Sequence, residues 1–139
     1  MSLKKLLLVI PFILCLITCA EDPLIGQWER FGDDAEGTIV IVEIVGTMYH
    51  GRLLKSAGIL DLLGFTENDI KWRDIEPVGA GKWKGKDLIK KINLEGEITS
   101  IEYKDVYFTM IGEGVMEVRK FAQESKLFGE VQRWCRVNN

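Results

Sequence analysis

The stretch TIVIVEIVGTMYHGRLLK, residues 38–55, predicts two neighbouring strands and sets the pattern for the rest of the chain. Its first part, residues 38–45, is rich in β-branched residues and is apolar on both faces up to Glu43, as in a well-covered strand. Gly46 and Thr47 then give a turn signal before a second strand-like run at residues 48–55. The stretch therefore predicts an antiparallel pair.

Strand-like runs continue on both sides of this pair, at spacings of about ten residues. A polar turn at residues 32–37 precedes it, and Gly-rich breaks follow at 79–81 and 112–114. The other runs are 26–31, 70–79, 82–91, 98–112, 115–121 and 130–137. About eight strands in one meander avoid exposed edges best by closing on themselves, so we predict an all-β, antiparallel up-and-down barrel.

One segment, residues 57–69, departs from the strand pattern. Ile59, Leu60, Leu62 and Leu63 recur at helical intervals, which predicts a short helix or lid.

The first 20 residues predict a cleavable export signal. Lys4 and Lys5 precede an apolar run at residues 6–17, which is shorter than the ~20 residues that span a bilayer. Small residues at 18–20 favour cleavage before Glu21, leaving a barrel domain at residues 21–139. We therefore expect a periplasmic or secreted protein.

A second processing route stays open, because residues 16–19 resemble a bacterial lipobox. In that case Cys19 would carry lipid, and the protein would be an outer-membrane lipoprotein. Membrane attachment is expected only by that route.

Cysteine and charge limit the fold and its partners. Either route leaves Cys135 as the only ordinary thiol, so the core must be stable without an internal disulfide. The signal carries two lysines and no acid, so its removal changes the net charge from −3 to −5. This balance argues against a nucleic-acid partner.

The sequence contains no arrangement of residues that predicts catalysis, a metal site or a cofactor. His50 is the single histidine, and the carboxylates Asp69, Asp74, Glu76 and Asp87 are scattered. The segment GAGKWKGKD, residues 79–87, has the wrong glycine-to-lysine interval for a phosphate-binding loop, so we interpret it as a hairpin. Its lysines, at 82, 84 and 86, are interpreted as a solvated outer face in preference to an anion-binding stripe. We expect no enzyme.

Aromatic residues are spread over the expected strands. Four different expected strands carry the four tryptophans, Trp28, Trp72, Trp83 and Trp134, and these are joined by Tyr49, Phe108 and Phe121. Such a set either lines a small-ligand cavity or fills the barrel, and in a barrel of this size the filled core is favoured.

The two ends of the chain resemble lipocalin-like (calycin) barrels. Gly26 and Trp28 match the Gly-x-Trp of the first strand, and Arg136 matches the arginine of the last strand. The resemblance implies that Arg136 packs across Trp28 and closes one end.

A closer resemblance is to small exported bacterial proteins whose domain of unknown function is thought to form such a barrel. It rests on the order of several short motifs along the chain. These are EDPLIGQW at 21–28, Tyr49-x-Gly51-x-Leu53, Gly81-x-Trp83-x-Gly85, residues 116–119, and residues 129–136.

We expect a barrel of this kind to be a module that binds a small, partly apolar molecule or an envelope lipid. We expect Tyr49, Trp83, Phe108 and Met110 to line its open end. The alternative is a filled barrel that acts through its surface as a structural or protein-interaction module.

The direction of side chains in the last strand is the sharpest prediction, because a slip of one residue reverses both faces. Composition favours the face with Cys135 and the two valines, 131 and 137, as interior. Closure requires the other face, with Gln132, Trp134 and Arg136. We predict that Trp134 and Arg136 point inward and Cys135 outward.

Overall fold

The computed structural model describes residues 22–120 and 131–138, which form eight strands and one short helix. The predicted signal with Cys19, and also Phe121 and Gly129, lie outside the described residues. The strands are β1 (Gly26–Phe31), β2 (Ile39–Val45), β3 (Met48–Lys55), β4 (Ile70–Gly79), β5 (Lys82–Ile92), β6 (Ile98–Gly112), β7 (Val115–Lys120) and β8 (Val131–Arg136). The helix α2 (Ile59–Leu62) lies within the segment predicted to be a helix or lid.

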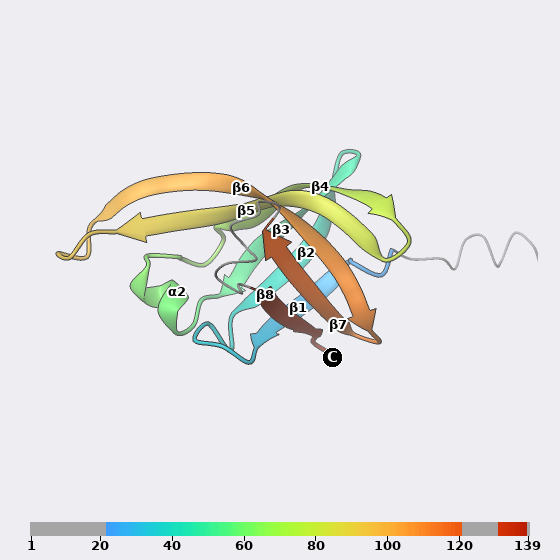
Figure 1. Ribbon diagram of the computed structural model, residues 1–139, viewed down its shortest axis with the longest axis horizontal. Coiled ribbons are helices and arrows are strands. Elements are labelled where there is room, and N and C mark those ends of the chain that lie inside the picture. Colours follow the sequence, from blue (N-terminus) through green and yellow to red (C-terminus); the bar gives the residue numbers. More distant parts are fainter. Residues whose placement is uncertain (1–21, 121–130, 139) are drawn as a thin grey trace, which may run out of the picture.

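The eight strands form one closed barrel in sequence order (Figure 1). Every neighbouring pair is antiparallel, and β1 also pairs with β8, with Trp28 opposite Arg136. The predicted all-β up-and-down barrel is therefore confirmed.

The alternating strand directions give the barrel two distinct ends. The tight turns β2–β3, β4–β5 and β6–β7 lie at one end, together with the start of β1 and the finish of β8. We call this the closed end. The loops that follow β1, β3 and β5 lie at the opposite end, which we call the pocket end; α2 belongs to the loop after β3. In Figure 1 the β4–β5 and β6–β7 turns of the closed end lie on the right, and α2 lies on the left.

The middle of the barrel is filled with aromatic side chains. Trp28, Trp72, Trp134 and Phe108 are fully buried. Trp72 meets Phe108 and Trp134 edge to face, with ring centroids 5.1 and 4.8 Å apart. Gly51 makes room for this cluster, because a Cβ atom there would lie 2.6 Å from Cε3 of Trp72. The expected filled core is present in this part of the barrel.

Arg136 covers the closed end as the resemblance implies. Its guanidinium carbon lies 4.5 Å from the centre of the Trp28 ring. Its Nη1 donates to the carbonyl of Ile25 at 2.7 Å, and its Nη2 donates to the carbonyl of Pro23. The guanidinium therefore joins β8 to the chain entering β1, and a cation–π contact adds to these hydrogen bonds.

Gly26 is required by this contact. Its φ of +124° lies in a region that side chains disfavour, and a Cβ atom would lie 2.8 Å from Nη1 of Arg136. Gly26 and Trp28 thus have a structural role, because the glycine leaves room for the Arg136 guanidinium and the indole packs against it.

The predicted orientation of β8 is confirmed. Trp134 is buried, whereas Cys135 is half-buried on the other face, opposite Glu29 and Val115. Composition favoured the wrong face because the two valines lie at the margins of the strand, where burial is partial.

Candidate ligand-binding site

The four residues predicted to line a cavity lie in or beside the filled part of the barrel. Phe108 and Trp83 are buried, and Met110 packs against the core. The hydroxyl of Tyr49 donates to Oδ2 of Asp22 at 2.6 Å, near the closed end. This hydrogen bond, with burial, raises the pKa of Tyr49. None of the four lines the pocket described next.

A pocket of about 370 Å³ lies at the pocket end instead. Helix α2 and the loops beside it form one side, and the ends of β1, β5, β7 and β8 form the other. Its apolar lining residues are Ile59, Leu60, Leu63, Phe65, Leu88, Ile89 and Val131. Its polar lining residues are Arg30, Asp33, Asp34, Lys90, Lys120 and Gln132. A pocket with this volume and mixed lining is within the range of small-molecule sites.

The inward-facing positions change character towards this pocket. On β8, Gln132 shares the inner face with Trp134, and on β1, Arg30 shares it with Trp28. The guanidinium of Arg30 lies 5.7 Å from the centre of the Trp134 ring, and its Nε donates to Oδ2 of Asp33 at 2.9 Å. The interior is therefore aromatic in the middle and polar beside the pocket.

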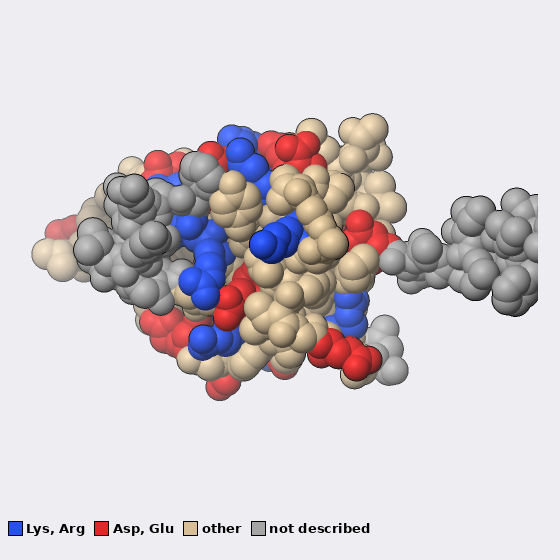
Figure 2. Space-filling model, turned by 45° about the vertical axis from the view of Figure 1, so that its right-hand side comes forward, with Lys and Arg blue, Asp and Glu red and all other residues tan. Residues whose placement is uncertain are grey.

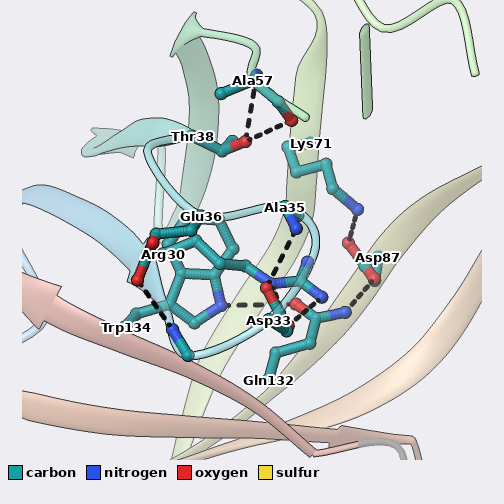
Figure 3. A network of polar contacts seen from close by, with 11 residues as sticks. Arg30, Asp33, Ala35, Glu36, Thr38, Ala57, Lys71, Asp87, Gln132 and Trp134 are labelled. Atoms are coloured by element: carbon teal, nitrogen blue, oxygen red, sulfur yellow. Dashed lines mark hydrogen bonds and ion pairs between the residues drawn. The ribbon is translucent and has the colours of Figure 1, made fainter. Parts of the chain in front are cut away.

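A buried ion pair lies behind the pocket (Figure 3). Nζ of Lys71 lies 2.5 Å from Oδ1 of Asp87 and also donates to the carbonyl of Leu88 at 2.9 Å. The side chains of the pair are only 3% and 2% exposed. A charge this well buried requires such a partner, because desolvation is costly.

Gln132 connects this ion pair to the aromatic core. Its Nε2 donates to Oδ2 of Asp87 at 3.4 Å, and its Oε1 accepts from Nε1 of Trp134 at 3.3 Å. Figure 3 shows these side chains in one chain of contacts that starts at Lys71. Since Gln132 also lines the pocket, a ligand there would lie beside the hydrogen-bonded network.

Burial lowers the pKa of Lys71, and Asp87 opposes this shift. The positive charges of Arg30 and Lys120 lower it further. The ammonium also lies 5.0 Å from the centre of the Phe65 ring, on the pocket lining. Arg30 and Lys120 line the pocket together with Asp33 and Asp34, so its polar lining carries both signs of charge.

Lys90 anchors the loop between α2 and β4, which lines one side of the pocket. Its Nζ donates to Oδ2 of Asp69 at 2.8 Å and to the carbonyl of Gly64 at 2.9 Å, and lies 5.2 Å from the centre of the Phe65 ring. Burial alone would raise the pKa of Asp69, but hydrogen bonds from Lys90 and Thr66 bring it below its usual value. The loop between α2 and β4 is therefore tied to β5.

His50 lies away from the pocket, on the β2–β3 pair. Its Nε2 is 3.0 Å from Oε2 of Glu43, and Oε1 of the same carboxylate accepts from Nη2 of Arg52 at 2.9 Å. Arg52 and His50 lower the pKa of Glu43. Among residues 22–120 and 131–138, no three His, Cys, Asp or Glu side chains are grouped to hold a metal ion.

A second hollow, of about 550 Å³, lies on the outer wall of the barrel. It brings Asp74 and Glu76 together with Lys84, Lys86 and Asp105, and Met48 and Gly85 complete its lining. Nζ of Lys86 is 3.8 Å from Oδ1 of Asp105, so the lysine stripe lies on the outer wall among carboxylates. In Figure 2, too, basic and acidic side chains lie next to each other on the face shown.

The Lys71–Asp87 pair was missed in the sequence. Side chains alternate between the two faces of a strand, so an inward Trp83 places Gly85 and Asp87 on the inner face as well. The burial of Asp87 could therefore have been predicted. Lys71 gave no such signal, because it is buried next to the buried Trp72, where the β3–β4 register shifts. The alternation of apolar and polar residues along a sequence does not reveal where the register between two strands shifts.

No protein-family model matches this chain, and neither a curated protein nor a solved structure resembles it significantly. Within the described ranges, no helix has the length and apolar character needed to cross a membrane.

Proposed function

We propose that this protein is an exported barrel of the cell envelope that binds a small, partly apolar molecule or an envelope lipid. The ligand would lie in the pocket beside α2, with its apolar part against Leu63 and Phe65. Its polar group would face the side that Arg30 and Gln132 line.

The observation that carries this proposal is the change of the barrel interior from aromatic to polar beside a pocket. A barrel that was only a filled scaffold would be as stable, or more so, with apolar side chains at these positions, because replacing a buried ion pair by well-packed apolar residues is often neutral or stabilising. The polar positions border a pocket of about 370 Å³, where they can also contact a ligand.

The test uses binding of 1-anilinonaphthalene-8-sulfonate, a probe with apolar rings and one anionic group. We expect one saturable site that Leu63→Arg weakens at least tenfold, because the longer side chain enters the pocket. Leu62→Arg is the matched control, since Leu62 is the neighbouring residue of α2 but is exposed and does not line the pocket. Equal binding by the wild type and Leu63→Arg would refute the proposal.

The natural ligand would be sought by native mass spectrometry of protein from its own envelope. A bound small molecule that is absent from Leu63→Arg would identify it.

The filled core favours a second candidate, a structural or interaction module that acts through its surface. Trp28, Trp72, Trp134 and Phe108 leave the middle of the barrel closed to a ligand. Under this alternative, the two arginine variants would behave alike in the probe assay and no molecule would co-purify.

A further inference from the structure

We propose that the closed end of the barrel docks on a lipid bilayer. This inference is independent of the ligand pocket, which lies at the other end of the molecule. It rests on three observations: the apolar side chains at the closed end, the charges at the two ends, and the place where the chain enters β1.

Apolar side chains project from the hairpins of the closed end. Five of them are between 37% and 62% exposed. They are Ile44, Val45 and Met48 beside the β2–β3 turn, Val78 beside the β4–β5 turn, and Ile111 beside the β6–β7 turn. Exposed apolar residues from three separate hairpins at one end are typical of an interaction surface.

The pocket end has longer connecting segments, and their net charge is strongly negative. The closed-end turns, 46–47, 80–81 and 113–114, and the segment 22–25 that enters β1 contain two charged residues, Asp22 and Glu113, and the exposed Lys82 directly follows the β4–β5 turn. The described pocket-end loops, 32–38, 56–69 and 93–97, contain eight acidic residues and no lysine or arginine. Carboxylates are costly to bring into a bilayer and are repelled by anionic lipids. Leu62, Leu94, Ile98 and Ile101 are also exposed at the pocket end, but they lie among these acids.

The chain enters the barrel at the closed end. Asp22 accepts the hydroxyl of Tyr49 at the start of β3, near the β2–β3 turn. In sequence, Cys19 is three residues before Asp22, and the apolar run at 6–17 precedes it. Three residues span at most roughly 10 Å. A lipid on Cys19 would therefore bring the closed end to the membrane surface.

These observations together select a lipid surface as the partner. Apolar side chains at the tips of hairpins can enter the interfacial region of a bilayer, and a second signal from an acyl chain would strengthen the attachment. The pocket end would then face away from the lipid.

The test measures partitioning onto phosphatidylcholine vesicles, using a chain that starts at Glu21. This chain contains all eight strands and every ladder of the barrel, and it lacks the apolar run and Cys19. Near-ultraviolet circular dichroism verifies that each protein is folded. Any partitioning then comes from the barrel itself.

Two matched triple variants compare the ends. Ile44→Ser, Val45→Ser and Met48→Ser together change the closed end, and Leu94→Ser, Ile98→Ser and Ile101→Ser change the pocket end. We expect the closed-end variant to lower the partition coefficient at least tenfold, and the pocket-end variant to stay within twofold of the wild type. All six side chains are exposed, so both variants should fold.

Three outcomes would overturn the proposal: no partitioning by the wild type, equal losses in the two variants, or a larger loss in the pocket-end variant. Sedimentation of the wild type is measured in parallel. A dimer that the closed-end variant abolishes, without any vesicle binding, would show that a second copy covers this end. The probe assay with Leu63→Arg tests the pocket separately, so either proposal can fail alone.

Discussion

Lys71 and Asp87 show how one pair of residues ties the barrel wall to its interior. The pair joins β4 to β5 where the interior changes from aromatic to polar. Lys71 also donates to Leu88, and Asp87 accepts from Gln132, so both charges are hydrogen-bonded beyond the pair itself. Without Lys71, the Asp87 carboxylate would remain buried with only a weak amide donor.

We therefore expect Lys71→Met to lower the free energy of unfolding by ~3 to 5 kcal/mol at neutral pH, because it leaves Asp87 buried and unpaired. The double variant Lys71→Met, Asp87→Leu should recover most of this loss, since neither charge remains. Urea unfolding of the wild type, both single variants and the double variant gives the coupling energy. A double variant as unstable as Lys71→Met would show that the loss comes from packing and not from the charge.

At the scale of the single strand, β8 makes three different contacts from one inner face. Gln132 faces the pocket, Trp134 lies in the core, and Arg136 covers the closed end. The outer face carries Arg133 and the half-buried Cys135. One strand thus runs through all three layers of the interior, and its register fixes all three contacts together.

This register predicts the chemistry of Cys135. We expect its thiol to react with Ellman's reagent (5,5′-dithiobis-2-nitrobenzoate) in the folded protein. The reaction should be slower than that of an exposed thiol, because the side chain is half-buried. The rate is compared with that of the same chain in urea. A thiol that reacts only through global unfolding would mean that the outer face of β8 is covered.

The strands and their order were predictable because their signals are local. Alternation, β-branched residues and Gly-rich turns mark each strand, and eight such strands without a disulfide favour closure. The contact of Arg136 with Trp28 followed from the ordered motifs. The pocket did not, because Leu60, Leu63 and Phe65 come from the one irregular loop, whose path over β5 depends on the Lys90 contacts.

The predicted cavity residues failed to line the pocket for a related reason. Aromatic residues on the inner faces of strands are compatible both with a cavity that they line and with a core that they fill. The contacts of Trp72 with Phe108 and Trp134 show that this part of the interior is filled. They involve three strands, β4, β6 and β8, and so could not be predicted from any one strand.

On the scale of the whole molecule, closure of the barrel makes β8 indispensable. Without it, β1 and β7 would both become free edges, and Trp28 would lose its cover. We expect a chain that ends at Lys120 to lose cooperative thermal unfolding and to aggregate. A chain that ends at Val137 is the control and should stay monomeric and fold, because Val137 still donates to Gln27. Size-exclusion chromatography and circular dichroism give the comparison, and a folded monomer ending at Lys120 would refute the expectation.

The ladder between β1 and β8 also sets the order of events in folding. Every other ladder joins strands that are adjacent in sequence, whereas this one joins Trp28 to Arg136. Bringing such distant strands together costs about 2 kcal/mol more chain entropy than closing a loop of about ten residues. The hairpins should therefore form first and this seam last. Until β8 pairs with β1, the partly formed sheet has two unpaired edges. Other chains can pair with these edges for as long as this slowest step of folding takes.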